Sequence, residues 1–429
     1  MLKVHTYLLL LVMLLIGFGL QIKGTANNPT YSNQQASPNP NFLFLSDIHL
    51  NTTSNSTDYG SDTGMDLWNL FLSKTDSILA GPNAPSFIIY TGDLPAHYSW
   101  SSSAFLPLDG RTTHNANITA ILSGLRSIAN KYHKPLFYLP GNNDGLAGDY
   151  YSFTDAQQQT PLSLSTDSIN PFPALNINRS GKKAPCIVSN PNPSMGYYSA
   201  RPIAGLRIIA LNTVMYSPDF ATNDGSDIVA DRNLQMKWLA GQLANAKSKH
   251  EKVYLTMHVP PGMDAYSNVG MWQQPADGSK SWLNTFLTLT NRYQNTIAGI
   301  LYGHTHMDEV RRLYDSTGTK ITEVAISCPG VTPQHHNNPG FKTVQYDAIT
   351  KELMDFTTFY TQPTTVNYWG NATYNFNATY QGMPSMSIYQ RLSTLPFNDV
   401  NTYMSSIFTV KAASAKYPIQ QGIEVKWGQ

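Results

Sequence analysis

The sequence repeats one local pattern five times: a short, continuous apolar run that leads directly into a polar loop. In the first copy, Phe42–Leu45 is followed by Ser46-Asp47-Ile48-His49. Apolar runs of this length are typical of strands that are buried on both faces of a sheet. The five predicted strands are Phe42–Leu45, Phe87–Tyr90, Leu136–Leu139, Val253–Thr256 and Ile297–Tyr302.

Helical patterns lie between these runs. Apolar residues three and four positions apart predict helices over Leu67–Leu79, Ile118–Tyr132 and Leu234–Ala246. Strands that alternate with helices indicate a layered α/β fold. In such folds the loops at the carboxyl ends of the strands converge on one edge of the sheet, where binding and catalytic sites form. We therefore expect the five polar loops to meet.

The polar loops together supply a set of metal ligands. Any one of them is weak evidence, because a lone His or Gly-Asp after a strand is more often structural. The set contains oxygen and nitrogen donors and no sulfur, which is what two divalent cations about 3.5–4 Å apart need, with one carboxylate between them. The candidate ligands are Asp47, His49, Asp93, Asn142, His258, His304 and His306.

These loops, in this order, resemble the signature of calcineurin-like metallophosphoesterases. Longer segments are similar to the acid sphingomyelinase-like phosphodiesterase branch of that family: Gly92–His97, His258–Gly262, Gly303–Glu309 and Asn338–Phe341. The resemblance covers residues 42–360. It implies an α/β fold with four layers, αββα, in which two packed sheets are flanked by helices.

The resemblance also implies roles for the ligands. One metal would be held by Asp47, His49 and His306, and the other by Asn142, His258 and His304, with Asp93 bridging both. Zn²⁺ is the implied metal, and Mn or Fe is also compatible with this ligand set. The implied nucleophile is a metal-bridging hydroxide, because two cations lower the pKa of a shared water toward about 7.

Two further positions bear on catalysis. The family's Gly-Asn-His-Glu/Asp loop is here Gly141-Asn142-Asn143-Asp144. Asn143 can donate a hydrogen bond but cannot protonate a leaving group. His97, four residues after Asp93, is retained from the branch pattern and is the candidate general acid; the alternative is a residue that orients a metal ligand. His335 and His336 are interpreted as a polar surface pair, with substrate contact as the alternative.

The amino terminus predicts export. Lys3 and His5 precede an apolar run, Tyr7–Leu20, and small residues follow at Gly24-Thr25-Ala26. We interpret residues 1–26 as a signal peptide and residues 27–41 as a flexible connector. An uncleaved membrane anchor is the alternative, although the run is short for a bilayer span of about 20 residues. The expected location is secreted, lysosomal or periplasmic, with no integral membrane span after cleavage.

The pattern of strands and loops ends near Tyr360. We therefore assign residues 42–360 to the catalytic domain and residues 361–429 to a small helical subdomain, with helices over Tyr374–Tyr389 and Val400–Lys411. Glycosylation is an open expectation, because a chain rich in Asn, Ser and Thr also produces acceptor sequences by chance. The acceptor sequences begin at Asn51, Asn55, Asn117, Asn178, Asn371 and Asn377.

The composition excludes some classes of partner and of covalent cross-link. The chain has 28 Lys+Arg and 27 Asp+Glu, a net charge of +1, which argues against binding a nucleic-acid polymer through a basic face. Its two cysteines, Cys186 and Cys328, exclude a disulfide scaffold and allow at most one bond.

The expected function is an exported phosphodiesterase, acting as a monomer on a small phosphodiester or a nucleotide phosphoanhydride. Sphingomyelinase itself carries a lipid-presenting saposin-like domain before the catalytic one, and the short connector here leads us to expect a smaller substrate. Two alternatives stay open: a phosphomonoesterase, or a catalytically weak protein that binds metals and phosphate esters.

Overall fold

The computed structural model describes residues 39–97, 108–164, 186–223, 225–264, 269–274, 281–362, 369–411 and 420–429. The predicted signal peptide, most of the predicted connector and the acceptor sequence at Asn178 lie outside these ranges. Residues 39–429 form one compact unit. Of the helices in the described ranges, none has the length and apolar character needed to cross a membrane.

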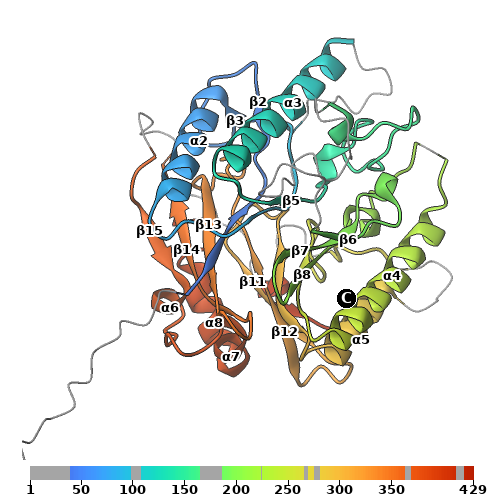
Figure 1. The fold of residues 1–429 in the computed structure, drawn as a ribbon, viewed down its shortest axis with the longest axis vertical. Coiled ribbons are helices and arrows are strands. Elements are labelled where there is room, and N and C mark those ends of the chain that lie inside the picture. The colour runs from blue at the N-terminus through green and yellow to red at the C-terminus, as the bar shows by residue number, and fades with distance from the viewer. Residues whose placement is uncertain are drawn as a thin grey trace, which may run out of the picture. The chain divides into compact units, whose positions relative to one another are not determined.

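Two sheets form the centre of this unit (Figure 1). The first has the order β15-β14-β13-β1-β4-β5 and the second the order β16-β11-β12-β10-β9-β8-β7-β6. The first sheet contains β1 (Asn41–Leu45), β4 (Ile88–Tyr90), β5 (Leu136–Tyr138), β13 (Gly340–Tyr346), β14 (Leu353–Tyr360) and β15 (Thr373–Asn375). The second contains β6 (Ile187–Ser189), β7 (Tyr198–Ile203), β8 (Leu206–Ala210), β9 (Lys252–Thr256), β10 (Ile297–Tyr302), β11 (Val310–Tyr314), β12 (Ile321–Ser327) and β16 (Glu424–Val425).

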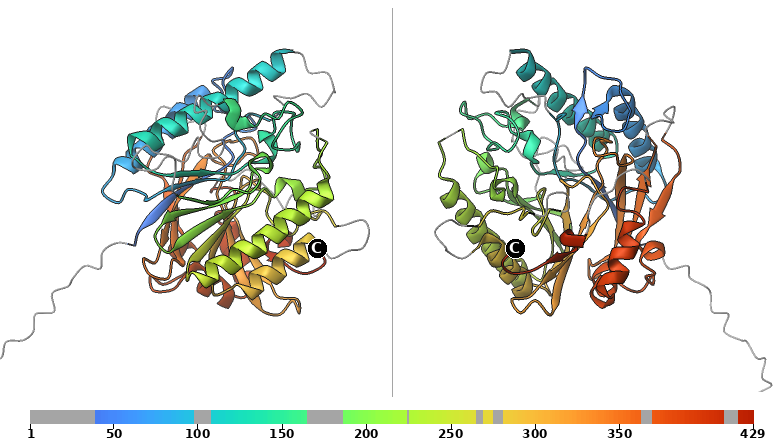
Figure 2. Two further views of the ribbon diagram at one scale, coloured as in Figure 1. Left: turned by 45° about the vertical axis from the view of Figure 1, so that its right-hand side comes forward. Right: turned by 180° about the vertical axis from the view of Figure 1, so that it is seen from behind.

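Helices cover the outer side of each sheet. Figures 1 and 2 show α2 (Met65–Ala80) and α3 (Leu108–Lys131) on one side, and α4 (Ile228–Ser248) and α5 (Trp282–Arg292) on the other. Helix α4 packs on β8 and β9, and α5 packs on β11 and β12. The three predicted helices are confirmed by α2, α3 and α4, although α3 ends one residue before the predicted end at Tyr132. The predicted arrangement of two packed sheets flanked by helices is also confirmed.

The five apolar runs form strands because both of their faces are covered. All residues of Phe42–Leu45 are buried. Phe42 of β1 stacks on Phe87, with ring centroids 5.0 Å apart, and lies 5.6 Å from Tyr254 of β9 in the other sheet. This aromatic contact joins the two sheets directly. Strands β1, β4 and β5 are parallel, as are β8, β9, β10 and β12, so the loops that follow them leave at common edges.

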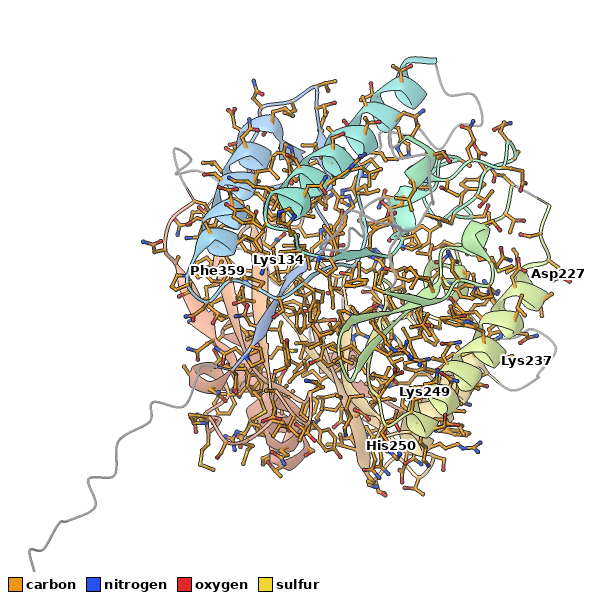
Figure 3. All side chains as sticks on the ribbon, viewed as in Figure 1. Lys134, Asp227, Lys237, Lys249, His250 and Phe359 are labelled. Atoms are coloured by element: carbon orange, nitrogen blue, oxygen red, sulfur yellow. The ribbon has the colours of Figure 1, made fainter. Side chains whose placement is uncertain are left out.

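Two small parallel strands, β2 (Leu50–Asn51) and β3 (Thr63–Gly64), pair in the segment between β1 and α2. Helix α4 starts at a side-chain cap, since the Asp227 carboxylate accepts hydrogen bonds from the backbone N–H groups of Val229 (3.0 Å) and Ala230 (3.1 Å). Figure 3 shows Asp227 at one end of α4 and Lys249 and His250 at the other. The negative charge of Asp227 and the positive charge of Lys249 therefore interact favourably with the helix dipole.

The segment beyond residue 360 differs from the expected helical subdomain. It holds short helices, α6 (Phe376–Thr379), α7 (Ile388–Thr394), α8 (Phe397–Ser405) and α9 (Gln420–Ile423), but also β15 and β16. Strand β15 pairs with β14 in the first sheet and β16 pairs with β11 in the second. The single helix predicted over Tyr374–Tyr389 is wrong, because β14 takes Thr373–Asn375 as its edge partner. This segment completes both sheets within the one compact unit.

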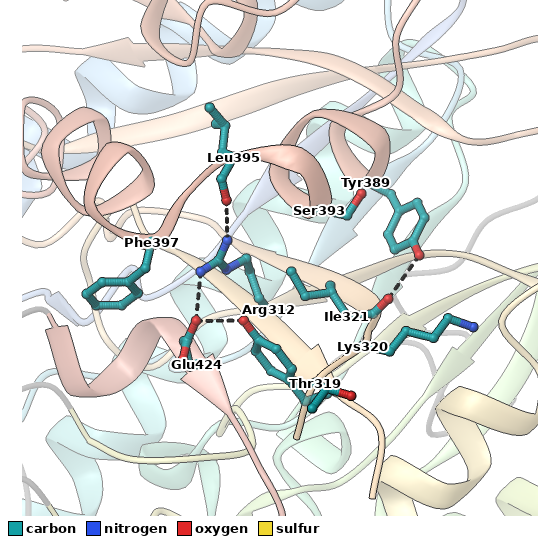
Figure 4. A pocket seen from close by; sticks show the side chains of 10 residues that line it. Arg312, Thr319, Lys320, Ile321, Tyr389, Ser393, Leu395, Phe397 and Glu424 are labelled. Atoms are coloured by element: carbon teal, nitrogen blue, oxygen red, sulfur yellow. Dashed lines mark hydrogen bonds and ion pairs between the residues drawn. The ribbon is translucent and has the colours of Figure 1, made fainter. Parts of the chain in front are cut away.

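Figure 4 shows how the end of the chain is held against β11. The Arg312 guanidinium donates to the backbone oxygen of Leu395 (2.7 Å) and to the Glu424 carboxylate (2.7 Å), and the Tyr314 hydroxyl also donates to Glu424 (2.6 Å). These residues line an open pocket between β11, β12 and α7. The candidate metal ligands are not among its lining residues.

Positions in the fold bear on two questions that the sequence left open. Cys186 and Cys328 are not joined. Cys186 precedes β6 and Cys328 follows β12, five strands away in the second sheet, or about 24 Å at 4.8 Å per strand, which a disulfide cannot span. Asn117 is buried and its amide oxygen accepts two hydrogen bonds from Thr52, so it does not present a glycosylation site in the folded chain.

Candidate metal centre

The loops after five strands bring all seven candidate ligands together. Three loops leave the first sheet after β1, β4 and β5, and two leave the second sheet after β9 and β10. The cluster therefore lies where the carboxyl ends of strands from both sheets meet. Six of the seven side chains are buried, and His304 is half-buried.

One group of ligands lies on the β1 side. His49 Nε2 is 3.1 Å from Asp93 Oδ2 and 3.1 Å from His306 Nε2. His306 Nε2 is 3.4 Å from Asp47 Oδ1. Each of these four residues offers a ligand atom within 4.8 Å of the others, so together they could hold one metal ion.

A second group shares Asp93 with the first. His258 Nε2 is 3.2 Å from Asp93 Oδ2 and 3.0 Å from Asn142 Oδ1, which in turn is 2.9 Å from His304 Nδ1. Asp93 is the side chain common to both groups. The two groups have the membership that the family resemblance implied; that they bind metal ions remains a prediction.

The donors in this cluster fit a cation. His49 Nδ1 lies 3.0 Å from the backbone oxygen of Pro95, so the ring must donate there and its Nε2 presents a lone pair to the Asp93 carboxylate. Burial lowers the pKa of His49, which favours the neutral ring. Two acceptor atoms 3.1 Å apart repel each other unless a positive charge lies between them.

His258 is arranged in the same way. Its Nδ1 lies 2.6 Å from the backbone oxygen of Thr91, and its Nε2 faces two acceptors, on Asp93 and Asn142. Burial alone would lower the pKa of His258, but the Asp93 carboxylate raises it to about 9. A proton or a metal cation can fill this position, and metal binding at such a site releases the proton.

The backbone at the ligands is strained. Asp47, His49, Asp93, His304 and His306 have φ angles of 49°, 46°, 64°, 74° and 59°. This left-handed region is rare outside glycine and costs on the order of 1–3 kcal/mol per residue. Hydrogen bonds between loops hold it: Asp47 N donates to Gly92 O (3.0 Å), and His49 N donates to Asp93 O (3.2 Å). The two adjacent parallel strands thus fix the ligand geometry.

Two glycines of the motif are required by close approach. A Cβ at Gly141 would lie 2.2 Å from Asp93 Oδ1, and a Cβ at Gly303 would lie 2.0 Å from Ser46 Oγ. Neither distance is compatible with a side chain. These glycines allow the loops of β5 and β10 to reach the carboxylates that follow β4 and β1.

His97 lies beside the first group. Its ring stacks on His49 with centroids 3.7 Å apart, and its Nδ1 is 2.6 Å from the Asp62 carboxylate. Burial disfavours the charged ring, but the hydrogen bond and charge of Asp62 raise the pKa of His97 above its ordinary value. Asp62 could not be found from the sequence, because it lies in a polar loop without a motif and reaches His97 only in the folded chain.

Asn143 contacts the bridging carboxylate. Its backbone N–H donates to Asp93 Oδ1 (2.9 Å) and its side-chain amide donates to Asp93 Oδ2 (3.3 Å). The next residue, Asp144, is buried and accepts from the N–H groups of Gly141 (2.7 Å) and Leu94 (2.6 Å) and from the Tyr138 hydroxyl (2.8 Å). Asp144 therefore ties the loop after β5 to the loop after β4.

Asp149 orients Asn142. The Asn142 amide nitrogen donates to Asp149 Oδ1 (2.8 Å), which leaves the amide oxygen facing His258 and His304. The sequence offered no signal for Asp149, since it follows the motif by several residues in an irregular loop. Carboxylates that orient metal ligands in this way are generally as important to a site as the ligands.

We predict that Asp149→Ala weakens metal binding about 10–100-fold, the usual effect of removing such an orienting group. The expected loss arises because the Asn142 amide becomes free to rotate its oxygen away from His258. Competition with a chromogenic chelator measures the affinity. Asp399→Ala, at an exposed position on α8, is the control and should bind metal as the parent does. Equal affinity in the two variants would refute the orienting role.

In the structure His335 lies beside the ligand cluster, although the sequence suggested a surface position. Its ring is half-buried and its centroid lies 4.6 Å from that of His306 and 6.2 Å from that of His97. Burial, together with the neighbouring His97 and His49, lowers the pKa of His335 to about 4. The interpretation of His335 and His336 as a surface pair is wrong for His335, whereas His336 is exposed.

The chain is similar to a known protein family and to several curated proteins. The family model for calcineurin-like phosphoesterases matches residues 40–308. Sphingomyelin phosphodiesterase of Bos taurus is 28% identical over 293 residues, which cover 65% of this chain and 40% of that protein. The cyclic GMP-AMP phosphodiesterase SMPDL3A of Homo sapiens is 26% identical over 365 residues, or 77% of this chain and 72% of that protein.

A crystal structure of a dimetal phosphatase from Danio rerio is similar with a TM-score of 0.47 and 12% sequence identity, covering 76% of this chain and 97% of that chain. The present chain spans well under half the length of the bovine relative. Residues 40–308 hold all seven clustered side chains and the strands that place them, and the chain therefore belongs to the calcineurin-like phosphoesterase family.

Proposed function

We propose that this chain is a metal-dependent phosphodiesterase that hydrolyses a small phosphodiester or a nucleotide phosphoanhydride. The observation that carries the proposal is the cluster of seven oxygen and nitrogen ligands, in which the Nε2 atoms of His49 and His258 lie 3.1 Å and 3.2 Å from the same oxygen of Asp93. The relatives named as sphingomyelin and cyclic GMP-AMP phosphodiesterases support a diester over a monoester.

In this proposal Asp47, His49 and His306 would hold one ion, Asn142, His258 and His304 would hold the other, and Asp93 would serve both. Four imidazoles with carboxylates and an amide favour zinc, and Mn or Fe also suits them. Two such cations would supply a water acidified toward a pKa of about 7 and positive charge beside the phosphoryl oxygens. This explains how a chain of net charge +1 can accept an anionic substrate.

The remaining steps fall to side chains around the ligands. We assign His97 as the proton donor to the leaving oxygen, held in orientation by its 2.6 Å contact with Asp62. Asn143 donates its amide N–H to Asp93 and so orients the shared carboxylate. Because the side chain of Asn143 has no acidic proton to give, His97 carries the proton transfer in this assignment.

We further propose that residues 1–26 direct export to a secreted, lysosomal or periplasmic location, and that the chain acts as a monomer. Mass spectrometry of the mature protein from a secreting host would test the cleavage, because the proposal requires a new amino terminus after Ala26. Recovery of an intact amino terminus in a membrane fraction would support an anchor in its place.

A metal-binding protein with little turnover is the second candidate, and Asn143 is the observation that favours it. We predict that the parent, loaded with zinc, hydrolyses bis-p-nitrophenyl phosphate faster than p-nitrophenyl phosphate. Asn143→His should raise kcat for the diester by at least about 10-fold, because an added acid can contribute 10²–10⁴-fold. Initial rates at saturating substrate measure both effects.

Asn143→Ala serves as the control, since it removes the contact with Asp93 without adding an acid. A parent with no diester activity, together with an active Asn143→His variant, would favour the binding protein. Faster hydrolysis of the monoester by the parent would favour a phosphomonoesterase. Absence of activity in the parent and in both variants at full metal content would refute the proposed function.

A further inference from the structure

His335 reaches the cluster from a loop that holds none of the seven ligands. It follows β12 and lies between Cys328 and Gly340, where β13 begins. Its ring meets His306 edge to face, at 4.6 Å and 67°, and meets His97 at 6.2 Å and 86°. Because His306 is 2% exposed and His335 is half-buried, His335 lies on the solvent side of this half of the cluster.

The loop is fastened to the ligand loops at several points. Gly330 N donates to the backbone oxygen of His306 (3.1 Å) and Thr332 N donates to that of Asp47 (3.2 Å). Farther along, Gly60 N donates to Pro333 O (3.0 Å) and the Asn337 amide donates to Thr332 O (3.0 Å). The His335 ring is thus placed relative to Asp47 and His306 by the fold, as the position of a substrate contact requires.

The side chains near His335 leave a role for a further hydrogen-bond donor to the substrate. Asn143 uses its amide on Asp93, and His97 is engaged by Asp62 and stacked on His49. A phosphate ester that reaches the His306 side presents anionic oxygens. Imidazole can donate an N–H to such an oxygen, and hydrogen bonds to charged groups are stronger than those between neutral groups.

We infer that His335 is a substrate-contacting residue, which donates an N–H to a phosphoryl or leaving-group oxygen on the His306 side of the cluster. The inference rests on the proposed function for its substrate class and identifies a contact that the family motifs do not include. No proton transfer is assigned to His335. Its contribution is a hydrogen bond from a ring that the loop holds in place.

The test compares His335→Ala with its neighbour His336→Ala, which is exposed and serves as the matched control. Binding of inorganic phosphate to the zinc-loaded proteins, measured by isothermal titration calorimetry, should weaken about 10- to 100-fold in His335→Ala, the range for one hydrogen bond to a charged group. His336→Ala should bind phosphate within twofold of the parent. His335→Gln, which keeps an N–H donor, should recover part of the lost affinity.

Zinc content and kinetics separate this role from others. Full zinc content in His335→Ala is expected, together with a fall in kcat/KM for bis-p-nitrophenyl phosphate that matches the loss of phosphate affinity. Phosphate affinity equal to that of His336→Ala would overturn the inference, as would a loss of zinc that accounts for the whole effect. Because phosphate binding needs no turnover, an inactive parent would refute the proposed function and still leave His335 tested.

Discussion

Replacing Asp93 with alanine is expected to release metal from both halves of the centre and to abolish diester hydrolysis. Asp93 is the side chain that both ligand groups share, with Oδ2 3.1 Å from His49 Nε2 and 3.2 Å from His258 Nε2. Loss of one transition-state donor typically lowers the rate roughly 10²–10³-fold. We expect kcat/KM to fall by more than this, because both metal sites would lose a ligand. Elemental analysis and initial rates measure the two effects.

Asp66→Ala, an exposed acid on α2, is the control and should keep both metal and activity. His304→Ala should deplete one half of the centre more than the other, since His304 lies in the second group only. Retention of both metals by Asp93→Ala would show that the shared carboxylate does not bridge. If Asp93→Ala keeps full metal content and the activity of the parent, Asp93 has no catalytic role.

Replacing Asp308 with alanine is expected to lower the free energy of unfolding by about 3–5 kcal/mol, the cost of leaving a buried charge without its partner. Asp308 and Lys342 form an ion pair in which both side chains have 0% exposure. The Asp308 carboxylate also accepts from the hydroxyls of Thr358 (2.8 Å) and Tyr374 (2.6 Å). It thus ties the loop after β10 in one sheet to β13, β14 and β15 in the other. Urea denaturation measures the loss.

Asp76→Ala is the matched control, because it breaks an ion pair with Lys131 whose side chains are 37% and 58% exposed. Such surface pairs contribute at most about 1 kcal/mol. The double variant Asp308→Leu, Lys342→Met should be more stable than Asp308→Ala alone, since it leaves no unpaired charge. If Asp308→Ala costs no more than Asp76→Ala, the pair does not stabilise the contact between the sheets.

The strands and the ligands could be predicted from sequence because each depends on local residues. An apolar run such as Phe42–Leu45 has few alternatives to a buried strand. The polar loop that follows must leave at the carboxyl end of its strand. Within each sheet, parallel strands bring the loops that follow them to one edge, and the residue types in these loops narrow the chemistry. The packing of the two sheets then brings the two edges together.

The residues that the sequence could not place act across long separations. Asp62 contacts His97 and Asp149 contacts Asn142, but neither lies in a motif. His335 lies just before a motif, but its contact with His306 depends on hydrogen bonds between its loop and two other loops. The helix prediction beyond Tyr360 is partly wrong for a similar reason. Local propensity does not reveal that Thr373–Asn375 pairs with β14 at the edge of the first sheet.

The opening pattern of apolar runs and polar loops by itself indicated a layered α/β fold and the candidate ligands, because strand burial and ligand chemistry are properties of short segments. The family and the packing of two sheets were implied by the resemblance of these loops to the calcineurin-like signature. The tertiary structure alone decided that Cys186 and Cys328 lie too far apart to bond, that residues 361–429 complete both sheets, and that His335 faces the cluster. Each of these depends on distances between segments far apart in the chain, which are set by the packing of the two sheets.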